Sequence, residues 1–227
     1  FSKVYWHTLN TPQSEDKLIY EQPEAKELSF SPGVTTDGKY LVVTVWHGTD
    51  EQNRFYYREV NSDEPLVRVI NNPDARYTFI DNNGPIFYFS TDLGAPKGRI
   101  IAVDINNPSP DQWTEIIPEE KDVISSVGYI NHTFVISYLQ DAYSRLKLYN
   151  ENGTFIKDFA LPTIGTIGGL SGKKDVDELF FSFTSFLYPT TIFRYQFSTG
   201  DLTPFRKVKI DFNPAVFETK QVFYPSK

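Results

Sequence analysis

The sequence predicts an all-β fold of the β-propeller type, and two observations carry this prediction. Long apolar runs recur at a nearly constant distance: those that begin near Lys39, Pro85, His132 and Glu178 start 46, 47 and 46 residues apart. Aromatic residues make up 16% of the chain, with 19 Phe and 14 Tyr, and such side chains favour strands. A period of this length that holds four strands is typical of one propeller blade.

A β-sandwich with evenly spaced strands is the main alternative architecture. A sandwich does not require constant spacing with the same internal order of strands and turns, whereas a ring of repeated blades does. The most informative stretch is 179–202, where an apolar run ends at Pro189, a residue that cannot continue a helix. A second β-branched and aromatic run follows, and then the turn STGD at 198–201. This order of strand, tight connection, strand and turn favours the propeller.

Taken in order, the chain supplies half a blade, four full blades and an exit segment. Residues 1–27 hold two short strands, at 4–9 and 18–21, which amount to the half blade. The full blades are expected at 28–72, 73–118, 119–160 and 161–211. Their strands are expected at 28–34, 40–46, 54–60 and 66–70; at 77–80, 86–89, 99–104 and 113–117; at 124–130, 133–139, 146–149 and 155–159; and at 163–170, 179–186, 192–197 and 202–209.

Residues 212–227 leave the repeat, so the propeller is expected over residues 1–211. The end of the chain, QVFYPSK at 221–227, predicts a further strand that serves as an exit strand or linker. The chain opens on Phe1 and contains no Met. We therefore expect it to be an internal part of a larger protein.

Composition excludes several classes of function. The net charge of −7 argues against a nucleic-acid partner, because phosphate binding needs clustered Lys and Arg. No apolar run is long enough to span a membrane. The chain has no Cys, and therefore no disulfide or thiolate metal site. We expect a cytoplasmic location, with the periplasm or secretion as alternatives, because a signal peptide would lie outside this chain.

No motif predicts catalysis, a metal or a cofactor within the chain. The nearest sequence to a serine-hydrolase elbow, GLSGK at 169–173, lacks the second Gly at the required position, so a hairpin turn explains it better. The three His residues fall in different repeats, and none has another His within four residues. The acidic pairs 15–16, 119–120 and 175/177 occur at turns, where solvated carboxylates are common.

Several segments resemble the propeller of the prolyl oligopeptidase family of serine peptidases, also called prolyl endopeptidases or family S9. They are YWHTL at 5–9 followed by TPQSEDKL at 11–18, DGKYL at 37–41, FTSFL at 183–187 with Pro189 and Ile192, and QVFYPSK at 221–227. Asn10 stands where the family usually has Gly. The matches occur in the family's order and span the whole chain. Oligopeptidase B shares the first motif, but the stretch at 183–187 favours prolyl oligopeptidase.

The resemblance implies a particular fold and role. In that family a seven-bladed propeller is inserted in an α/β-hydrolase domain that carries a Ser-Asp-His triad, and the enzyme cleaves short peptides after proline. This chain would then be a partial propeller of about four and a half blades, from the end of the third to the seventh. The triad would lie outside it. The chain would limit the access of short peptides to the active site and line part of the substrate cavity.

The resemblance also points to residues that face the substrate. The loop His47-Gly48-Thr49 aligns with a loop that faces the active site in the family. Thr49 stands where some members have Cys, and Ser29 stands near the position where some have Met; both positions adjoin the third subsite of the substrate. These replacements would make the pocket smaller and more polar. A solvated loop is the simpler reading of any one of these residues.

The expected partners follow from the same reading. They are the α/β-hydrolase domain of the parent protein and short proline-containing peptides, with no nucleic acid and no membrane. Each blade of a propeller packs on two neighbours, so we also expect self-association through open blade ends. A free-standing propeller that binds a protein or a glycan on its loops is the alternative function. An enzyme with its own site in the propeller tunnel is a weaker rival, because titratable residues do not cluster at matching blade positions.

Overall fold

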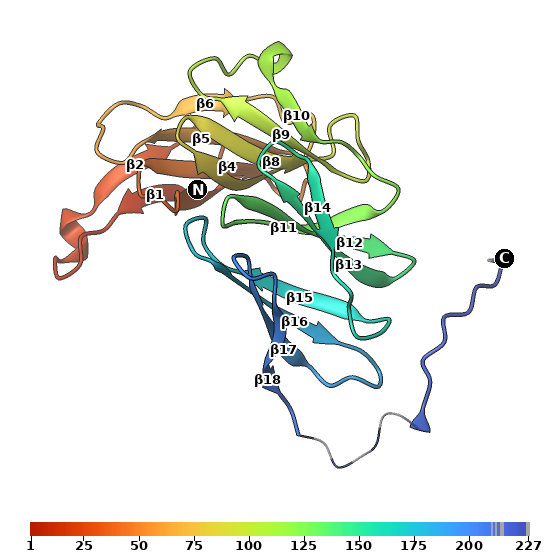
Figure 1. Cartoon of the computed structure of the whole chain (residues 1–227). Coiled ribbons are helices and arrows are strands. Elements are labelled where there is room, and N and C mark those ends of the chain that lie inside the picture. Colours follow the sequence, from red (N-terminus) through yellow and green to blue (C-terminus); the bar gives the residue numbers. More distant parts are fainter. Residues whose placement is uncertain (210, 212, 214–215, 226–227) are drawn as a thin grey trace. The chain divides into compact units, whose positions relative to one another are not determined.

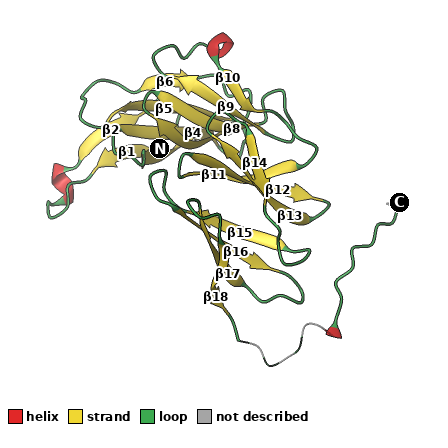
Figure 2. Cartoon of the chain, in the orientation of Figure 1, coloured by secondary structure: helices red, strands yellow, loops and turns green. Residues whose placement is uncertain are grey.

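The computed structural model describes residues 1–209, 211, 213 and 216–225 of the 227-residue chain. The chain forms two compact units, Phe1–Glu119 and Glu120–Lys227. Strands dominate both of them (Figures 1 and 2), and helix is confined to short 3-10 turns such as η1 (Gln13–Glu15) and η2 (Pro110–Gln112). The all-β prediction is therefore confirmed.

The first unit contains one two-stranded and two four-stranded antiparallel sheets. In each four-stranded sheet the strands pair in sequence order, as consecutive hairpins do. The elements are β1 (Lys3–Trp6), η1 (Gln13–Glu15) and β2 (Lys17–Glu21); β3 (Leu28–Val34), β4 (Tyr40–His47), β5 (Asn53–Glu59) and β6 (Val67–Ile70); and β7 (Tyr77–Asn83), β8 (Ile86–Thr91), β9 (Arg99–Asp104), η2 (Pro110–Gln112) and β10 (Thr114–Ile117).

The second unit contains two more four-stranded antiparallel sheets with the same sequential order. The first consists of β11 (Val123–Ile130), β12 (Thr133–Gln140), β13 (Tyr143–Asn150) and β14 (Phe155–Asp158). The second consists of β15 (Thr166–Ser171), β16 (Glu178–Thr184), β17 (Thr191–Gln196) and β18 (Leu202–Lys207).

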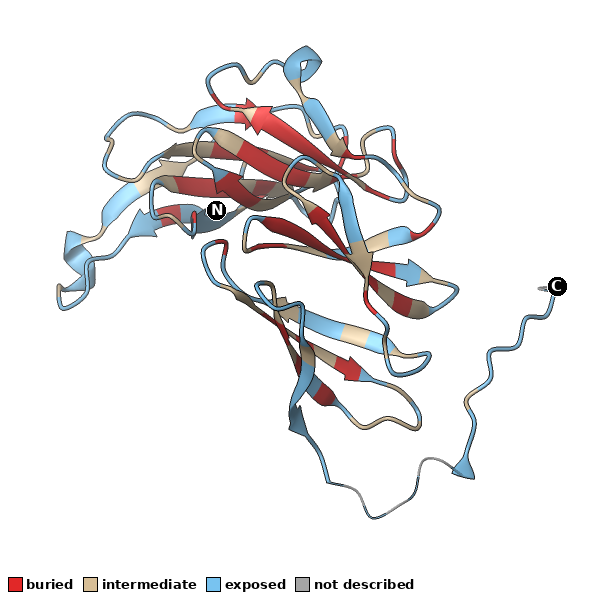
Figure 3. Cartoon of the chain, viewed as in Figure 1, coloured by how far each residue is buried: buried red, intermediate tan, exposed pale blue. Residues whose placement is uncertain are grey.

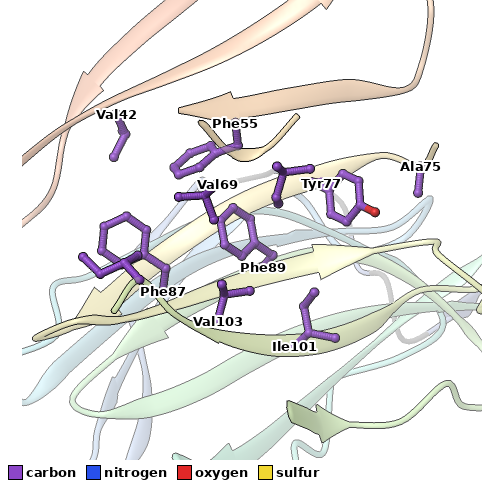
Figure 4. Packing of buried hydrophobic residues seen from close by; sticks show 11 residues of the cluster. Val42, Phe55, Val69, Ala75, Tyr77, Phe87, Phe89, Ile101 and Val103 are labelled. Carbon is purple, nitrogen blue, oxygen red and sulfur yellow. The ribbon is translucent and has the colours of Figure 1, made fainter. Parts of the chain in front are cut away.

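An aromatic core joins the two four-stranded sheets of the first unit. Phe55 on β5 is fully buried, and its ring centroid lies 4.8 Å from that of Phe89 on β8 and 5.1 Å from that of Phe79 on β7. Figure 4 shows Phe55, Phe87 and Phe89 gathered with Val42, Val69 and Val103 in this cluster. The rings meet edge to face or offset, which are the arrangements that aromatic pairs prefer.

Strand β4 is packed on both of its faces, as a continuous apolar run predicts. Val42 belongs to the aromatic core just described. Val43 and Val45, both fully buried, pack instead with Leu28 and Tyr56 in a second cluster, which Tyr20 of β2 adjoins. The two-stranded sheet therefore covers the other side of the β3–β6 sheet.

The second unit buries aliphatic side chains of one sheet against aromatic side chains of the other. Val135, Leu146 and Leu148 of the β11–β14 sheet share a cluster with Phe181 and Phe183 of β16. All five are 2% exposed or less. Consecutive sheets thus pack face to face in this unit too.

The outer strands and the last segment are much more exposed than the central strands (Figure 3). Five of the six residues of β18 are exposed, among them Phe205 at 53%. Exposed apolar residues also occur on the two-stranded sheet, with Tyr5 at 50% and Leu18 at 41%. Association of copies through such surfaces stays a prediction.

The exit strand or linker expected at 221–227 forms no paired strand over residues 221–225, and positions 226–227 lie outside the described residues. Val222, Phe223 and Tyr224 are each more than 70% exposed. The β-forming composition of this segment is not sufficient, because a strand also needs a neighbouring edge with which to pair.

Candidate functional site

The four residues expected to face a substrate lie at one end of the β3–β6 sheet. Strands β3 and β4 run antiparallel there, with Leu28 opposite His47 and Ser29 opposite Trp46. Residues paired across two strands share a face of the sheet, and successive residues along a strand alternate between faces. The side chains of Ser29 and His47 therefore project from opposite faces. The structure therefore brings the four residues to the same end without gathering their side chains on one surface.

The loop after β4 has a defined conformation although all of it is exposed. Gly48 has a φ of 53°, a left-handed conformation that favours glycine, and its N–H donates to the carbonyl of Glu27 at 3.4 Å. The amide of Asp50 donates to the carbonyl of His47 at 3.0 Å, and the carboxylate of Asp50 lies 2.9 Å from Nδ1 of His47. Thr49 stands at the exposed tip of this loop.

Asn53, the first residue of β5, fixes the loop to the next sheet. Its side chain is fully buried, accepts a hydrogen bond from the amide of Tyr77 at 2.8 Å and donates to the carbonyl of Tyr77 at 3.0 Å. Its own amide donates to the carbonyl of Ala75 at 3.2 Å. One side chain thus satisfies both backbone groups of Tyr77, as a neighbouring strand would.

Sequence reasoning missed Asn53. The only sequence signal is an amide residue at the start of an otherwise aromatic strand, where Asn is disfavoured. Its partner Tyr77 lies 24 residues away in the sequence. Burial, and then the 2.6 Å hydrogen bond that its hydroxyl donates to Asp74, raise the pKa of Tyr77. Such a pair becomes visible only when the two sheets are placed together.

The described residues do not assemble a serine-hydrolase site. Each His is matched to a nearby carboxylate: His7 to Asp16 at 2.7 Å, His47 to Asp50 at 2.9 Å and His132 to Asp175 at 3.2 Å. No serine hydroxyl of the described residues hydrogen-bonds a His. Ser171, from the near-match to an elbow, is simply the last residue of β15 and pairs with Phe180.

The acidic pairs have structural partners. The carboxylate of Asp177 accepts hydrogen bonds from the amide and the hydroxyl of Ser198, at 2.7 and 2.5 Å, and so closes a turn. Glu119 accepts the amide of Lys97 at 2.6 Å. No group of three or more His, Asp or Glu that could hold a metal occurs in the described part of the chain.

Glu120 differs from the solvated turn carboxylate that the sequence suggested. It pairs with the ammonium of Lys147 and accepts a hydrogen bond from the hydroxyl of Tyr149. Burial raises the pKa of Glu120, but the hydrogen bonds from Lys147 and Tyr149 outweigh it, and the net pKa is lowered. The residue is therefore an ionised anchor of the β13 strand.

Among the described residues, no helix is long and apolar enough to cross a membrane.

The fold defines this chain as a β-propeller domain, built from four-stranded antiparallel sheets that recur with one period. The sequence profile described as "Prolyl oligopeptidase, N-terminal beta-propeller domain" matches residues 1–208. The chain therefore belongs to the prolyl oligopeptidase family and lies in its N-terminal propeller domain.

Individual relatives agree with this assignment. The chain is 34% identical to the prolyl endopeptidase of Elizabethkingia miricola, over 99% of this chain and 32% of that protein. It is 31% identical to prolyl oligopeptidase A of Galerina marginata, over 99% of this chain and 31% of that protein. The apo structure of prolyl oligopeptidase B from Galerina marginata superposes with a TM-score of 0.89 and 28% identity, over 98% of this chain and 33% of that one. The chain thus spans about a third of the length of these relatives.

Proposed function

We propose that this chain is the non-catalytic propeller of a prolyl oligopeptidase-type serine peptidase, which limits the access of short peptides and lines part of the substrate cavity. The observation that carries the proposal is the match of residues 1–208 to the N-terminal propeller domain of the family, while the relatives are about three times longer than this chain. The remaining length would hold the α/β-hydrolase domain with its catalytic triad. The parent would cleave short peptides after proline.

The loop at the end of the β3–β6 sheet is suited to this role. It presents Thr49 to solvent, and the buried side chain of Asn53 holds its base. A rigid base with an exposed tip positions a side chain at low entropic cost when a peptide binds. Ser29 lies at the same end of the sheet and is exposed, on the face opposite to that of His47.

A bulky substitution in the full-length parent tests this role. In Thr49→Trp we expect the KM for a succinyl-Gly-Pro reporter peptide to rise about tenfold with little change in kcat, because the new side chain removes uniform binding at a subsite rather than transition-state contacts. Asn61→Trp is the matched control, since residue 61 is exposed beyond the other end of the same sheet, in the β5–β6 connection. Equal KM values for both variants and the wild type would contradict the proposed position of Thr49.

A further inference from the structure

A cleft of about 90 Å³ lies within the first unit, between the end of β6 and the start of β10. Much of its wall is apolar, with Val69 and Ile70 from β6, Leu93 from the β8–β9 connection and Pro110 from η2. Sites that enclose a whole small molecule measure roughly 300–1,000 Å³. A cleft of this size therefore fits one small group, such as the head group of a ligand.

Two aromatic rings, those of Tyr77 and Trp113, also line the cleft. Their centroids lie 5.8 Å apart and their planes cross at 84°. Both residues are fixed in place: Asn53 bonds both backbone groups of Tyr77, and the indole N–H of Trp113 donates to the carbonyl of Pro108 at 2.9 Å. Perpendicular rings form two adjacent sides of an aromatic cage, and the electron-rich face of such a ring attracts a cation.

Asp74 places a negative charge beside these rings. It is exposed, and among the described residues that line the cleft it carries the only charge. The hydroxyl of Tyr77 donates to its Oδ1 at 2.6 Å, and the side-chain amide of Asn72 donates to its Oδ2 at 3.0 Å. These two neutral donors orient the carboxylate without neutralising it, and each oxygen keeps a further lone pair. The carboxylate can therefore serve as the counter-ion of a bound cation.

The charges around the cleft do not offset that of Asp74. Arg99 pairs with Glu115, with 3.0 Å between Nη1 and Oε2. Arg54 projects from the face of β5 opposite to that of Phe55, which faces the aromatic core that Ile70 and Tyr77 also join. The charged residues directly adjacent in the sequence to the lining residues are two of each sign: Arg68, Arg76, Asp92 and Asp111. The cleft therefore keeps a net negative charge.

The second unit already holds an ammonium group in this way with a residue of its own. Nζ of Lys157 lies 5.0 Å from the ring centroid of Phe159 and 4.8 Å from that of Tyr195. These two rings also cross at nearly a right angle, 82°. A perpendicular aromatic pair in the core between two sheets thus binds a cation in this chain. The cleft of the first unit has the aromatic pair, but its described lining contains no Lys or Arg.

We propose that this cleft binds a small methylated ammonium group, such as the head group of choline, with its charge between Asp74 and the rings of Tyr77 and Trp113. A primary ammonium needs acceptors for three N–H groups. Among the described lining residues Asp74 is the only anionic acceptor, and much of the wall is apolar. A quaternary ammonium has no N–H group, and its methyl groups suit apolar and aromatic walls.

Titration of the ¹⁵N-labelled chain with choline chloride tests the site, with sodium chloride adjusted to keep the ionic strength constant. The chain has three Trp residues, so the indole N–H signal of Trp113 is one of three and reports on the cleft directly. We expect saturable shifts of this signal and of the amides of residues 69–74 and 93. The neutral analogue of choline, in which a quaternary carbon replaces the nitrogen, should bind about tenfold more weakly, because it lacks the charge.

Asp74→Asn should weaken choline binding about tenfold, because it removes the charge and keeps the shape. Glu24→Gln, at an exposed acidic position of the same unit outside the cleft, should leave binding unchanged. The amide spectrum of each variant shows that it is folded. Absence of saturable shifts, equal binding of choline and its neutral analogue, or wild-type affinity in folded Asp74→Asn would each overturn the proposal. The comparison of the two ligands uses the unaltered chain, so it decides the question even if Asp74→Asn does not fold.

Discussion

In the first unit, consecutive four-stranded sheets meet through aromatic rings of both sheets and a buried amide. In the second unit, aliphatic side chains of one sheet meet aromatic rings of the other, and a serine and a glycine lie at the contact. Phe55 reaches across to Phe89, and Asn53 brackets the backbone of Tyr77. In the second unit, the hydroxyl of Ser144 accepts the amide of Ile167 at 3.0 Å. A Cβ added to Gly172 would lie 2.6 Å from Cγ2 of Ile130 on the neighbouring sheet.

Consecutive sheets are therefore joined by different side-chain groups in the two units. In the first unit, a side-chain amide satisfies both backbone groups of Tyr77 on the next sheet. In the second unit, a hydroxyl accepts one backbone amide, and a side chain is absent at Gly172.

The largest effect is expected for Asn53→Ala in the first unit. The substitution leaves the amide and carbonyl of Tyr77, a residue that is 1% exposed, without their side-chain partner. Unsatisfied buried groups are costly, and we expect the free energy of unfolding to fall by about 3 kcal/mol. Urea denaturation measures the loss, with exposed Asn61→Ala as the control. A loss below about 1 kcal/mol would show that Asn53 does not join the sheets.

Gly172→Ala should have the next largest effect, in the second unit. The new Cβ would lie 2.8 Å from the backbone oxygen of Glu178 as well as against Ile130, so backbone must shift. We expect a loss of about 2 kcal/mol in the same denaturation assay. Gly33→Ala is the matched control, because its Cβ would meet Val42 at an ordinary 3.6 Å. Equal stability of Gly172→Ala and Gly33→Ala would contradict a close contact at Gly172.

Ser144→Ala tests the hydrogen bond that links the two sheets of the second unit. It removes only the bond to the amide of Ile167, while the bond from the amide of Ser144 to the carbonyl of Gly165, at 2.9 Å, remains. We expect a loss of about 1 kcal/mol, since one neutral hydrogen bond is lost. A loss as large as that of Asn53→Ala would mean that the sheet contacts of the two units depend equally on a side-chain hydrogen bond.

The smallest effect concerns pH and the second unit alone. The folded pKa of Glu120 is lowered, so its ion pair stabilises the fold above the unfolded pKa of about 4.3 and the contribution is lost as pH falls through the lower folded value. Glu120→Gln should therefore lose less than about 1 kcal/mol at pH 7 and show a flatter acid limb. Urea midpoints between pH 3 and 7 measure this. An unchanged acid limb would exclude Glu120 as a contributor.

The sequence was sufficient for the fold because the fold depends on a local pattern that repeats. The run starts near residues 39, 85, 132 and 178 correspond to β4, β8, β12 and β16, the second strand of each four-stranded sheet. Local pattern was less reliable at strand ends. The strand expected from residue 163 begins at Thr166, where the pairing with Thr184 of β16 starts.

The candidate site was less accessible to sequence reasoning. The exposed loop at 47–49 was found only through a resemblance, and the assignment of a substrate to it stays a prediction. Asn53 was missed because its partner Tyr77 is 24 residues away. A contact between residues far apart in the sequence has no local pattern to reveal it.

In the proposed function, this propeller shapes access to a peptidase without carrying the chemistry. Incubation of the purified chain with a succinyl-Gly-Pro reporter peptide tests it most directly, with Ser171→Ala as a companion variant. We predict no turnover above buffer for either protein, and turnover by the full-length parent under the same conditions. Turnover by the chain that survives removal of contaminants and disappears in Ser171→Ala would contradict the account.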